Sequence, residues 1–168
     1  QKPVLCLPIM SGIDFTDRAQ NSLSNAFQLA KDYAHAQLAP AHIALALLTD
    51  DTSNAQGVLS TNEDSQSLFK SICEKCGIKV SEFEDKLREN LRKIPQQSPA
   101  PDDVSLTGAA GKIFKHAQQL KTDQRDSFIA QDHILLALLD DPTISNILKQ
   151  SGLANPDLFK NAVNQARG

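Results

Sequence analysis

Residues 38–51 read LAPAHIALALLTDD, and residues 129–142, which lie 91 positions further on, read IAQDHILLALLDDP. Equivalent positions continue on both sides of this stretch, and the clearest are Thr16/Thr107, Ala19/Ala110, Ala26/Ala117, Leu29/Leu120, Gly77/Gly152 and Phe83/Phe159. Such self-similarity indicates one supersecondary unit that is used twice. Two copies are too few for an open solenoid, whose ends need separate caps. We therefore expect the two copies to face each other across a pseudo-two-fold axis.

Apolar residues within each copy recur with the period of an α-helix. A stripe on one face of a helix over about residues 16–34 consists of Ala19, Leu23, Ala26, Phe27 and Ala30. The run 43–48 is apolar on every side, which predicts a helix at the centre of the core. A third helix over about residues 66–76 is expected to end at Gly77, because glycine commonly follows a helix C-terminus.

Capping residues indicate where the other helices begin. Ser81 and Glu84 predict a capping box at the start of a fourth helix. In the second copy, Asp141 and Asn155 each precede a proline, the usual arrangement of an N-cap residue and the first helical position. No window alternates with period two, so we expect no sheet. The sequence thus predicts an all-α fold with eight helices, arranged as two four-helix repeats related by a pseudo-two-fold axis.

The chain divides into four segments of one compact domain. Residues 1–12 are interpreted as an added extension followed by the native start, because Met10 is the only methionine and the helical pattern follows soon after it. Repeat one covers residues 13–93, a proline-rich linker covers 94–104, and repeat two covers 105–168. The prolines of the linker exclude helix and favour an ordered, extended strap between the repeats. A proline-motif ligand for another protein is the alternative interpretation of the linker.

The composition excludes several classes of partner. The net charge is −3 and the cationic side chains are scattered, so no nucleic-acid partner is expected. Residues 1–10 are apolar, but they are too short to span a bilayer and lack the pattern of a secretory signal, so no membrane partner is expected. With seven Phe, one Tyr and no Trp, the core has to consist mainly of Leu, Ile and Ala, which favours packed helices.

The three cysteines do not predict a metal site. Cys73 and Cys76 form a single C-x-x-C, but no second cysteine pair and no closely spaced histidine pair completes a zinc site. A redox pair is the alternative. Because the pair falls in the predicted third helix, we interpret both residues as ordinary helical cysteines. An odd, sparse set of cysteines suits a reducing compartment.

The enzyme motifs that the sequence suggests are incomplete. Residues 108–113 read GAAGKI, but a phosphate-binding loop requires a glycine where Leu106 stands and a hydroxyl side chain where Ile113 stands. His42 and His133 occupy equivalent positions at the start of the two apolar runs, which favours a structural role in each copy over acid–base catalysis. No hydrolase triad motif or H-E-x-x-H sequence is present. We therefore expect neither enzymatic activity nor a cofactor in this chain.

Together with the repeat, four segments carry a resemblance to a known family. They are Phe15-Thr16 at the first helix start, PAHI at 40–43, IPQQ at 94–97 followed by PAP at 99–101, and, most specific, DSFIAQDHIL at 126–135. From about residue 13 to residue 168, the chain resembles the ClpB-like Clp N-terminal domain of the Hsp100 class of heat-shock disaggregases. It is most similar to the fungal type.

The resemblance implies a function. The chain would be the client-binding and regulatory module of an ATP-dependent protein disaggregase, which captures unfolded or extended apolar polypeptide in a groove. The parent protein would be a hexameric ATPase that acts on aggregated polypeptides, with ATP bound in its motor domains. Its location would be cytoplasmic, with the nucleus left open as a second location. The alternative is a docking platform for folded adaptor or co-chaperone proteins.

The resemblance also places a client-binding site on seven residues of this chain, namely Phe15, Thr16, Leu120, Asp126, Phe128, Asp132 and His133. In bacterial relatives, a threonine that opens the first helix and two acids around the second repeat's Phe-Ile motif handle clients, and these map onto Thr16, Asp126 and Asp132. Leu120 and Phe128 would line the groove, and His133 stands where bacterial members can have an apolar residue.

A structural role is the alternative for three of the polar residues of this site. Thr16 would cap the first helix, Asp132 would interact with a helix dipole, and Asp126 would close a turn. For the extension, we expect residues 3–9 to lie as a client mimic in the groove of a neighbouring molecule, and a tail ordered on the surface of its own domain is the alternative.

Overall fold

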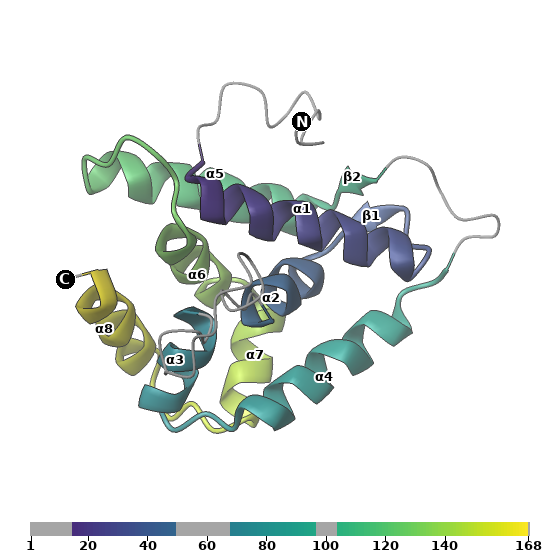
Figure 1. The fold of residues 1–168 in the computed structure, drawn as a ribbon. Helices are drawn as coiled ribbons and strands as arrows, with labels where there is room; N and C mark the ends of the chain where they lie inside the picture. Colours follow the sequence, from purple (N-terminus) through teal and green to yellow (C-terminus); the bar gives the residue numbers. More distant parts are fainter. Residues whose placement is uncertain (1–14, 50–67, 97–103, 168) are drawn as a thin grey trace, which may run out of the picture.

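The computed structural model describes residues 15–49, 68–96 and 104–167. These residues form eight helices and two short strands (Figure 1), which are α1 (Asp17–Asp32), β1 (Gln37–Leu38), α2 (Pro40–Leu48), α3 (Leu68–Lys75), α4 (Val80–Lys93), β2 (Ser105–Leu106), α5 (Gly108–Asp123), α6 (Gln131–Leu139), α7 (Pro142–Gln150) and α8 (Pro156–Arg167). The predicted all-α class with eight helices is confirmed. Within the same ranges, none of the helices has the length and apolar character that a membrane crossing needs.

The expectation that the chain contains no sheet is wrong. β1 and β2 pair in parallel, with Gln37 opposite Ser105 and Leu38 opposite Leu106. A further isolated bridge joins Phe15 to Ile129. These pairings form because the backbone groups just ahead of the helices need hydrogen-bond partners once they are buried. Strands of two residues are too short to produce a detectable alternation of apolar and polar residues.

These same pairings demonstrate the pseudo-two-fold relation between the copies. The N–H of Thr16 donates to the carbonyl of Ile129 at 2.9 Å, and the N–H of Thr107 donates to the carbonyl of Leu38 at 3.1 Å. Thr107 lies 91 positions after Thr16, and Ile129 lies 91 positions after Leu38. Each copy therefore gives the other the same donor and the same acceptor, which is the reciprocity that a two-fold arrangement requires.

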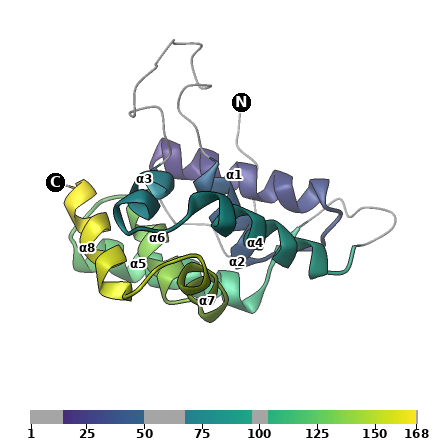
Figure 2. The same cartoon turned by 90° about the horizontal axis from the view of Figure 1, so that it is seen from below.

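The two copies share one interlocked core. Every residue of α2 and α6 is buried, and these two central helices contact each other. Viewed as in Figure 2, α1, α3 and α4 lie toward one side of the molecule and α5 and α7 toward the other, with α2 and α6 between them. α3 of the first copy packs against α8 of the second, and α4 of the first against α7 of the second. The copies are thus not independent bundles.

One predicted helix start is wrong, and the starts predicted at Asp141 and Asn155 are confirmed, while the start predicted near residue 66 lies outside the described residues. α4 begins at Val80 with Lys79 as its N-cap residue, so the capping box of Ser81 and Glu84 does not form. The N–H of Lys79 is held at 3.0 Å by the carbonyl of Ser151 in the other copy, which sets the chain's entry into α4 earlier than the local sequence indicates. Glu84 instead pairs with Arg88 at 2.9 Å.

The confirmed helix ends follow the expected capping chemistry. The carboxylate of Asp141 accepts a hydrogen bond from the N–H of Ile144, at 3.1 Å, at the start of α7. The side chain of Asn155 accepts from the N–H of Asp157 at 2.9 Å at the start of α8. After α3, Gly77 takes the left-handed conformation with φ of 77°.

Candidate functional site

The two equivalent histidines lie in the first turns of the two central helices. The Nδ1 of His42 accepts a hydrogen bond from the N–H of Ala39 at 2.8 Å, and the Nδ1 of His133 accepts from the N–H of Ala130 at 2.9 Å. A side chain that reaches back in this way forms half of a capping box, a role usually filled by Glu or Gln. Because Nδ1 is the acceptor, each ring carries its proton on Nε2. Both histidines therefore have the structural role that their equivalent positions predicted.

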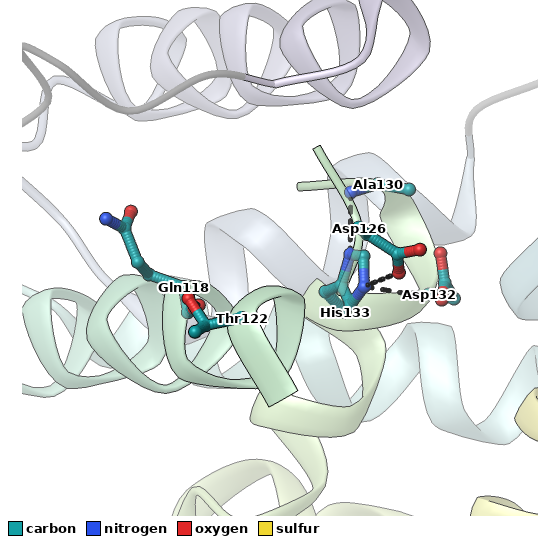
Figure 3. Close-up of polar contacts among 6 residues, drawn as sticks. All are labelled: Gln118, Thr122, Asp126, Ala130, Asp132 and His133. Carbon is teal, nitrogen blue, oxygen red and sulfur yellow. Dashed lines mark hydrogen bonds and ion pairs between the residues drawn. The ribbon is translucent and has the colours of Figure 1, made fainter. Parts of the chain in front are cut away.

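The two copies differ in the group that each histidine Nε2 meets. In the second copy, the Nε2 of His133 lies 2.8 Å from Oδ2 of Asp126 and 4.0 Å from Oδ2 of Asp132 (Figure 3). In the first copy, the Nε2 of His42 lies 2.9 Å from Nδ1 of His35, which stands 91 positions before Asp126. The His133 ring is buried, whereas the Asp126 side chain is 30% exposed. The second copy thus presents a carboxylate to solvent where the first buries a histidine.

A left-handed turn places Asp126 over the start of α6. The residue after the α5 C-cap, Arg125, has φ of 61°, and the N–H of Asp126 returns to the carbonyl of Lys121 at 2.9 Å. This is the hydrogen-bond pattern of a Schellman motif. The first copy ends α1 in the same way, with Ala34 at φ of 58°. The turn reverses the chain, so that the Asp126 carboxylate points back toward His133 in Figure 3.

Asp132 and Gln131 lie in the first turn of α6. The carboxylate of Asp132 is nearly buried at this helix N-terminus, where the helix dipole favours negative charge. The side chain of Gln131 donates to Oγ of Ser22 in α1 at 2.8 Å, and both residues are buried. Sequence reasoning missed this contact because its partners lie 109 positions apart and the equivalent residues, Pro40 and Ile113, cannot form it.

Phe15 and Thr16 join the start of α1 to the segment ahead of α6. The Oγ1 of Thr16 accepts from the N–H of Ala19 at 3.2 Å, so Thr16 is the N-cap residue of α1, as its structural alternative predicted. The bridge to Ile129 holds Phe15 beside the residue that follows Phe128. The ring of Phe15 also packs edge-on against Phe114, with centroids 6.3 Å apart.

Phe128 is the exposed apolar residue of the site. Its exposed fraction is 50%, and within the described ranges only Leu158, at 47%, is a comparably exposed large apolar residue. Leu120 is partly buried against the core in the last turn of α5, and its carbonyl accepts from the N–H of Gln124 at 2.9 Å. The structure therefore brings Asp126, Asp132 and His133 into one cluster. Phe15 and Thr16 adjoin the segment that carries Phe128, while Leu120 lies on α5 before the turn.

The cluster supplies hydrogen-bond acceptors to its exposed side. Ionised carboxylates only accept, and they bind N–H donors and cations through charge-assisted hydrogen bonds. In the part of the chain that the structure describes, no group of three or more His, Cys, Asp or Glu residues has an arrangement that could hold a metal ion. A surface of this kind can bind the N–H groups of an extended chain beside an apolar contact.

The C-x-x-C cysteines lie in and just after α3 and are both free thiols. Cys73 is buried and Cys76 is half-buried. Burial raises the pKa of both thiols above the ordinary value, so neither is activated as a thiolate. This environment supports their interpretation as ordinary helical cysteines. Cys6, the client-mimic segment 3–9 and the prolines at 99 and 101 lie outside the described residues.

Comparison with known proteins gives consistent matches. A family model described as the Clp repeat (R) N-terminal domain matches residues 14–63 and 59–151. Heat shock protein 104 of Schizosaccharomyces pombe is 36% identical over 159 residues, which cover 95% of this chain and 16% of that protein. Heat shock protein hsp98 of Neurospora crassa is 37% identical over 160 residues, covering 94% of this chain and 17% of that protein. The chain therefore spans only about a sixth of the length of these relatives.

Solved structures match over nearly the whole chain. The crystal structure of the Hsp104 N-terminal domain from Candida albicans has a TM-score of 0.75 and 35% sequence identity, and the match covers 92% of both chains. The N-terminal domain of ClpD from Arabidopsis thaliana has a TM-score of 0.64 at 18% identity, covering 92% of this chain and 98% of that one, which shows a shared fold.

Proposed function

The chain belongs to the Clp repeat (R) N-terminal domain family, as found in chaperones such as heat shock protein 104, and from this premise we propose that it captures extended apolar polypeptide on the surface around Phe128. We call this the Phe128 surface and define it by Phe15, Asp126, Phe128 and Asp132. The observation that carries the proposal is the half-exposed ring of Phe128 beside a partly exposed carboxylate.

The internal repeat supports a specific role for this ring. The position equivalent to Phe128 in the first copy is Gln37, which lies in β1 and pairs with Ser105. Both copies have a residue at this point in the segment ahead of the central helix, and in the first copy this residue is polar. The fold therefore does not require an aromatic side chain here. The exposed half of the Phe128 ring offers an apolar partner to a ligand. Its burial contributes a binding free energy of roughly 25 cal/mol for each Å² of apolar surface removed from water.

The carboxylates complement the backbone of such a ligand. An extended chain presents N–H groups that lack partners, and apolar side chains that alternate with them. Oδ2 of Asp126 accepts the Nε2–H of His133, and part of the Asp126 side chain is exposed to solvent. Charge-assisted hydrogen bonds of this kind are stronger than neutral ones. The apolar ring would supply affinity and the carboxylate would orient the backbone.

A protein of the same fold is known with a peptide. The ClpV N-domain has been solved in complex with a VipB peptide, and its TM-score against this chain is 0.60 at 15% identity. That complex concerns ClpV, and it motivates the choice of an extended chain as the probe. In the full-length protein, the chain is then the N-terminal client-binding and regulatory module of a hexameric, cytoplasmic disaggregase that binds ATP in other domains.

The proposal predicts that Phe128→Ala weakens binding of an unfolded client about tenfold. Burying the exposed half of a Phe ring is worth about 1–1.5 kcal/mol, and 1.4 kcal/mol corresponds to a factor of ten. Fluorescence anisotropy would be measured with labelled α-lactalbumin in its reduced, unfolded form and in its native form. The native form should bind weakly or not at all, and tight binding of only the folded form would favour a docking platform.

Two further variants sharpen this test. Leu158→Ala removes a second exposed large apolar side chain, which lies on α8, and should leave binding unchanged. Asp126→Asn keeps an oxygen acceptor for His133 but removes the charge, so binding should weaken and lose part of its salt dependence. Equal losses in Phe128→Ala and Leu158→Ala would contradict a localised site. An unchanged affinity in Phe128→Ala would refute the proposal.

A further inference from the structure

The first copy contains a fully buried pair of histidines. His35 and His42 are both 0% exposed, and the Nδ1 of His35 lies 2.9 Å from the Nε2 of His42. Their ring centroids are 5.1 Å apart, with an interplanar angle of 64°. His35 follows the C-terminal turn of α1, and His42 lies in the first turn of α2. The pair therefore ties the end of one helix to the start of the next.

The hydrogen bonds through this pair run in one direction. The N–H of Ala39 donates to Nδ1 of His42, so the ring of His42 carries its proton on Nε2 and donates it to His35. The Nδ1 of His35 is then an acceptor, which leaves its own proton on Nε2. That Nε2 finds no hydrogen-bond partner among the described residues, although the backbone of Ile94 lies near enough to favour the charged ring.

The series of hydrogen bonds from Ala39 through His42 to His35 has no ring nitrogen that can take an additional proton without losing a contact. A proton on Nδ1 of His42 would face the N–H of Ala39, and a proton on Nδ1 of His35 would face the Nε2–H of His42. Either event replaces a donor–acceptor contact with two opposed donors. In the second copy, the corresponding chain runs from Ala130 through His133 to the carboxylate of Asp126, which accepts. The two copies should therefore respond differently to acid.

We propose that the His35–His42 pair is an acid-sensitive latch, which holds the start of α2 and the strand β1 in place and releases them when either ring gains a proton. The contacts beside the latch extend its effect to the junction of the copies. Ala36 accepts from the N–H of Ser105, and Leu38 accepts from the N–H of Thr107, both at 3.1 Å. Release of the latch loosens the segment that carries both acceptors.

The surroundings of the latch disfavour positive charge. Burial, and secondarily the neighbouring His35, lowers the pKa of His42 to about 4. Burial also lowers the pKa of His35, against the opposing effect of the Ile94 backbone. Tyr33 stacks on His35 with centroids 5.5 Å apart.

The charged groups on the elements around the latch either pair with other side chains or are exposed to solvent. Arg88 of α4 interacts with the Tyr33 hydroxyl and pairs with Glu84, which places a cation on that side. On α1, Lys31 and Asp32 precede the latch and are exposed, and Asp32 accepts from the side chain of Gln28 at 2.9 Å. α2 contains no Asp, Glu, Lys or Arg.

The sign of the pH effect follows from these shifts. The pKa of His42 is lower in the folded state than its unfolded value of 6.5, so its neutral ring contributes stability that is complete above the unfolded pKa. This contribution is lost as the pH falls from 6.5 toward about 4. Between pH 7 and pH 5, proton binding to this ring in the unfolded state lowers the folding equilibrium constant about 20-fold.

The test is urea unfolding of the 168-residue chain at pH 7 and pH 5, followed by far-UV circular dichroism. His42→Gln places at this position a residue that commonly completes a capping box, so it can keep the acceptor for Ala39 without titrating. The ratio of the wild-type folding constant to that of His42→Gln should fall about 20-fold between the two pH values. His116→Gln, which removes a half-buried histidine of the second copy that lies 3.0 Å from the Asp140 carboxylate, outside the latch, should keep the wild-type response. Equal acid sensitivity in His42→Gln and wild type would overturn the proposal.

A second measurement uses the wild-type chain alone and remains decisive if His42→Gln does not fold. Imidazole ¹H–¹⁵N NMR should show His42 with its proton on Nε2 at pH 7, and its titration should occur well below pH 6. Amide exchange at Ala39, corrected for the intrinsic rate, should accelerate as the ring titrates. A His42 ring that titrates near 6.5, or that carries its proton on Nδ1 at neutral pH, would show that no latch exists.

Discussion

Replacing Phe69 with alanine is expected to lower the free energy of unfolding by about 3–5 kcal/mol, the usual range for a buried Phe that leaves a cavity. Phe69 is 1% exposed and makes edge-on contacts to two other buried rings. Its centroid lies 5.3 Å from that of Phe83 and 6.0 Å from that of Phe159. Phe83 belongs to the first copy and Phe159 to the second, so the substitution removes a contact that joins the two halves. Urea unfolding followed by circular dichroism measures the effect.

Phe128→Ala is the matched control for this substitution. It removes the same atoms from a side chain that is already half-exposed, so the loss of stability should be below about 1 kcal/mol. The Phe69→Ala chain should also unfold in a single transition at lower urea concentration, because the cavity lies between helices of both copies. Similar stabilities for the two variants, or separate transitions for two halves, would contradict a shared core.

The helical architecture could be predicted because the sequence repeats the pattern of burial. Every residue of α2 and α6 is buried, and the two apolar runs are therefore constrained in the same way. The offset of 91 positions also identified Thr16 and Thr107 as equivalent. Both are N-cap residues, and the backbone N–H of each donates to a carbonyl of the other copy. Predictions from the local sequence were wrong where a hydrogen-bond partner in the other copy decides the backbone geometry. The start of α4 and the β1–β2 pairing are both of this kind.

The candidate site could be predicted only in part. The sequence shows that His42 and His133 are equivalent, and the residues seven positions before them are therefore equivalent as well. The sequence does not show that these residues touch the histidines, because one is His35 and the other is Asp126, and only the left-handed turn brings them back. The exposure of Phe128 had no signal of its own, since an aromatic residue beside a core segment is usually buried.

Gly152→Ala is expected to lower the free energy of unfolding by about 2–6 kcal/mol, because a disfavoured backbone conformation and a steric overlap add to each other. Gly152 has φ of 127°, which residues with a side chain rarely adopt. A Cβ at this position would lie 2.9 Å from the carbonyl oxygen of Gly77, and the backbone of the facing turn cannot move freely. The N–H of Lys79 fixes that turn by its hydrogen bond to Ser151.

The equivalent glycine of the first copy has a positive φ without a steric overlap. Gly77 also has a positive φ, at 77°, but a Cβ there would meet no atom within 4 Å. Gly77→Ala should therefore cost only about 1 kcal/mol, the strain of a left-handed alanine. Urea unfolding of both variants beside wild type measures the difference, which combines the steric overlap at Gly152 with its more disfavoured φ. If the two substitutions cost the same, the turns do not meet as the structure shows, and the interlocking of α3 and α4 with α7 and α8 would lose one of its supports.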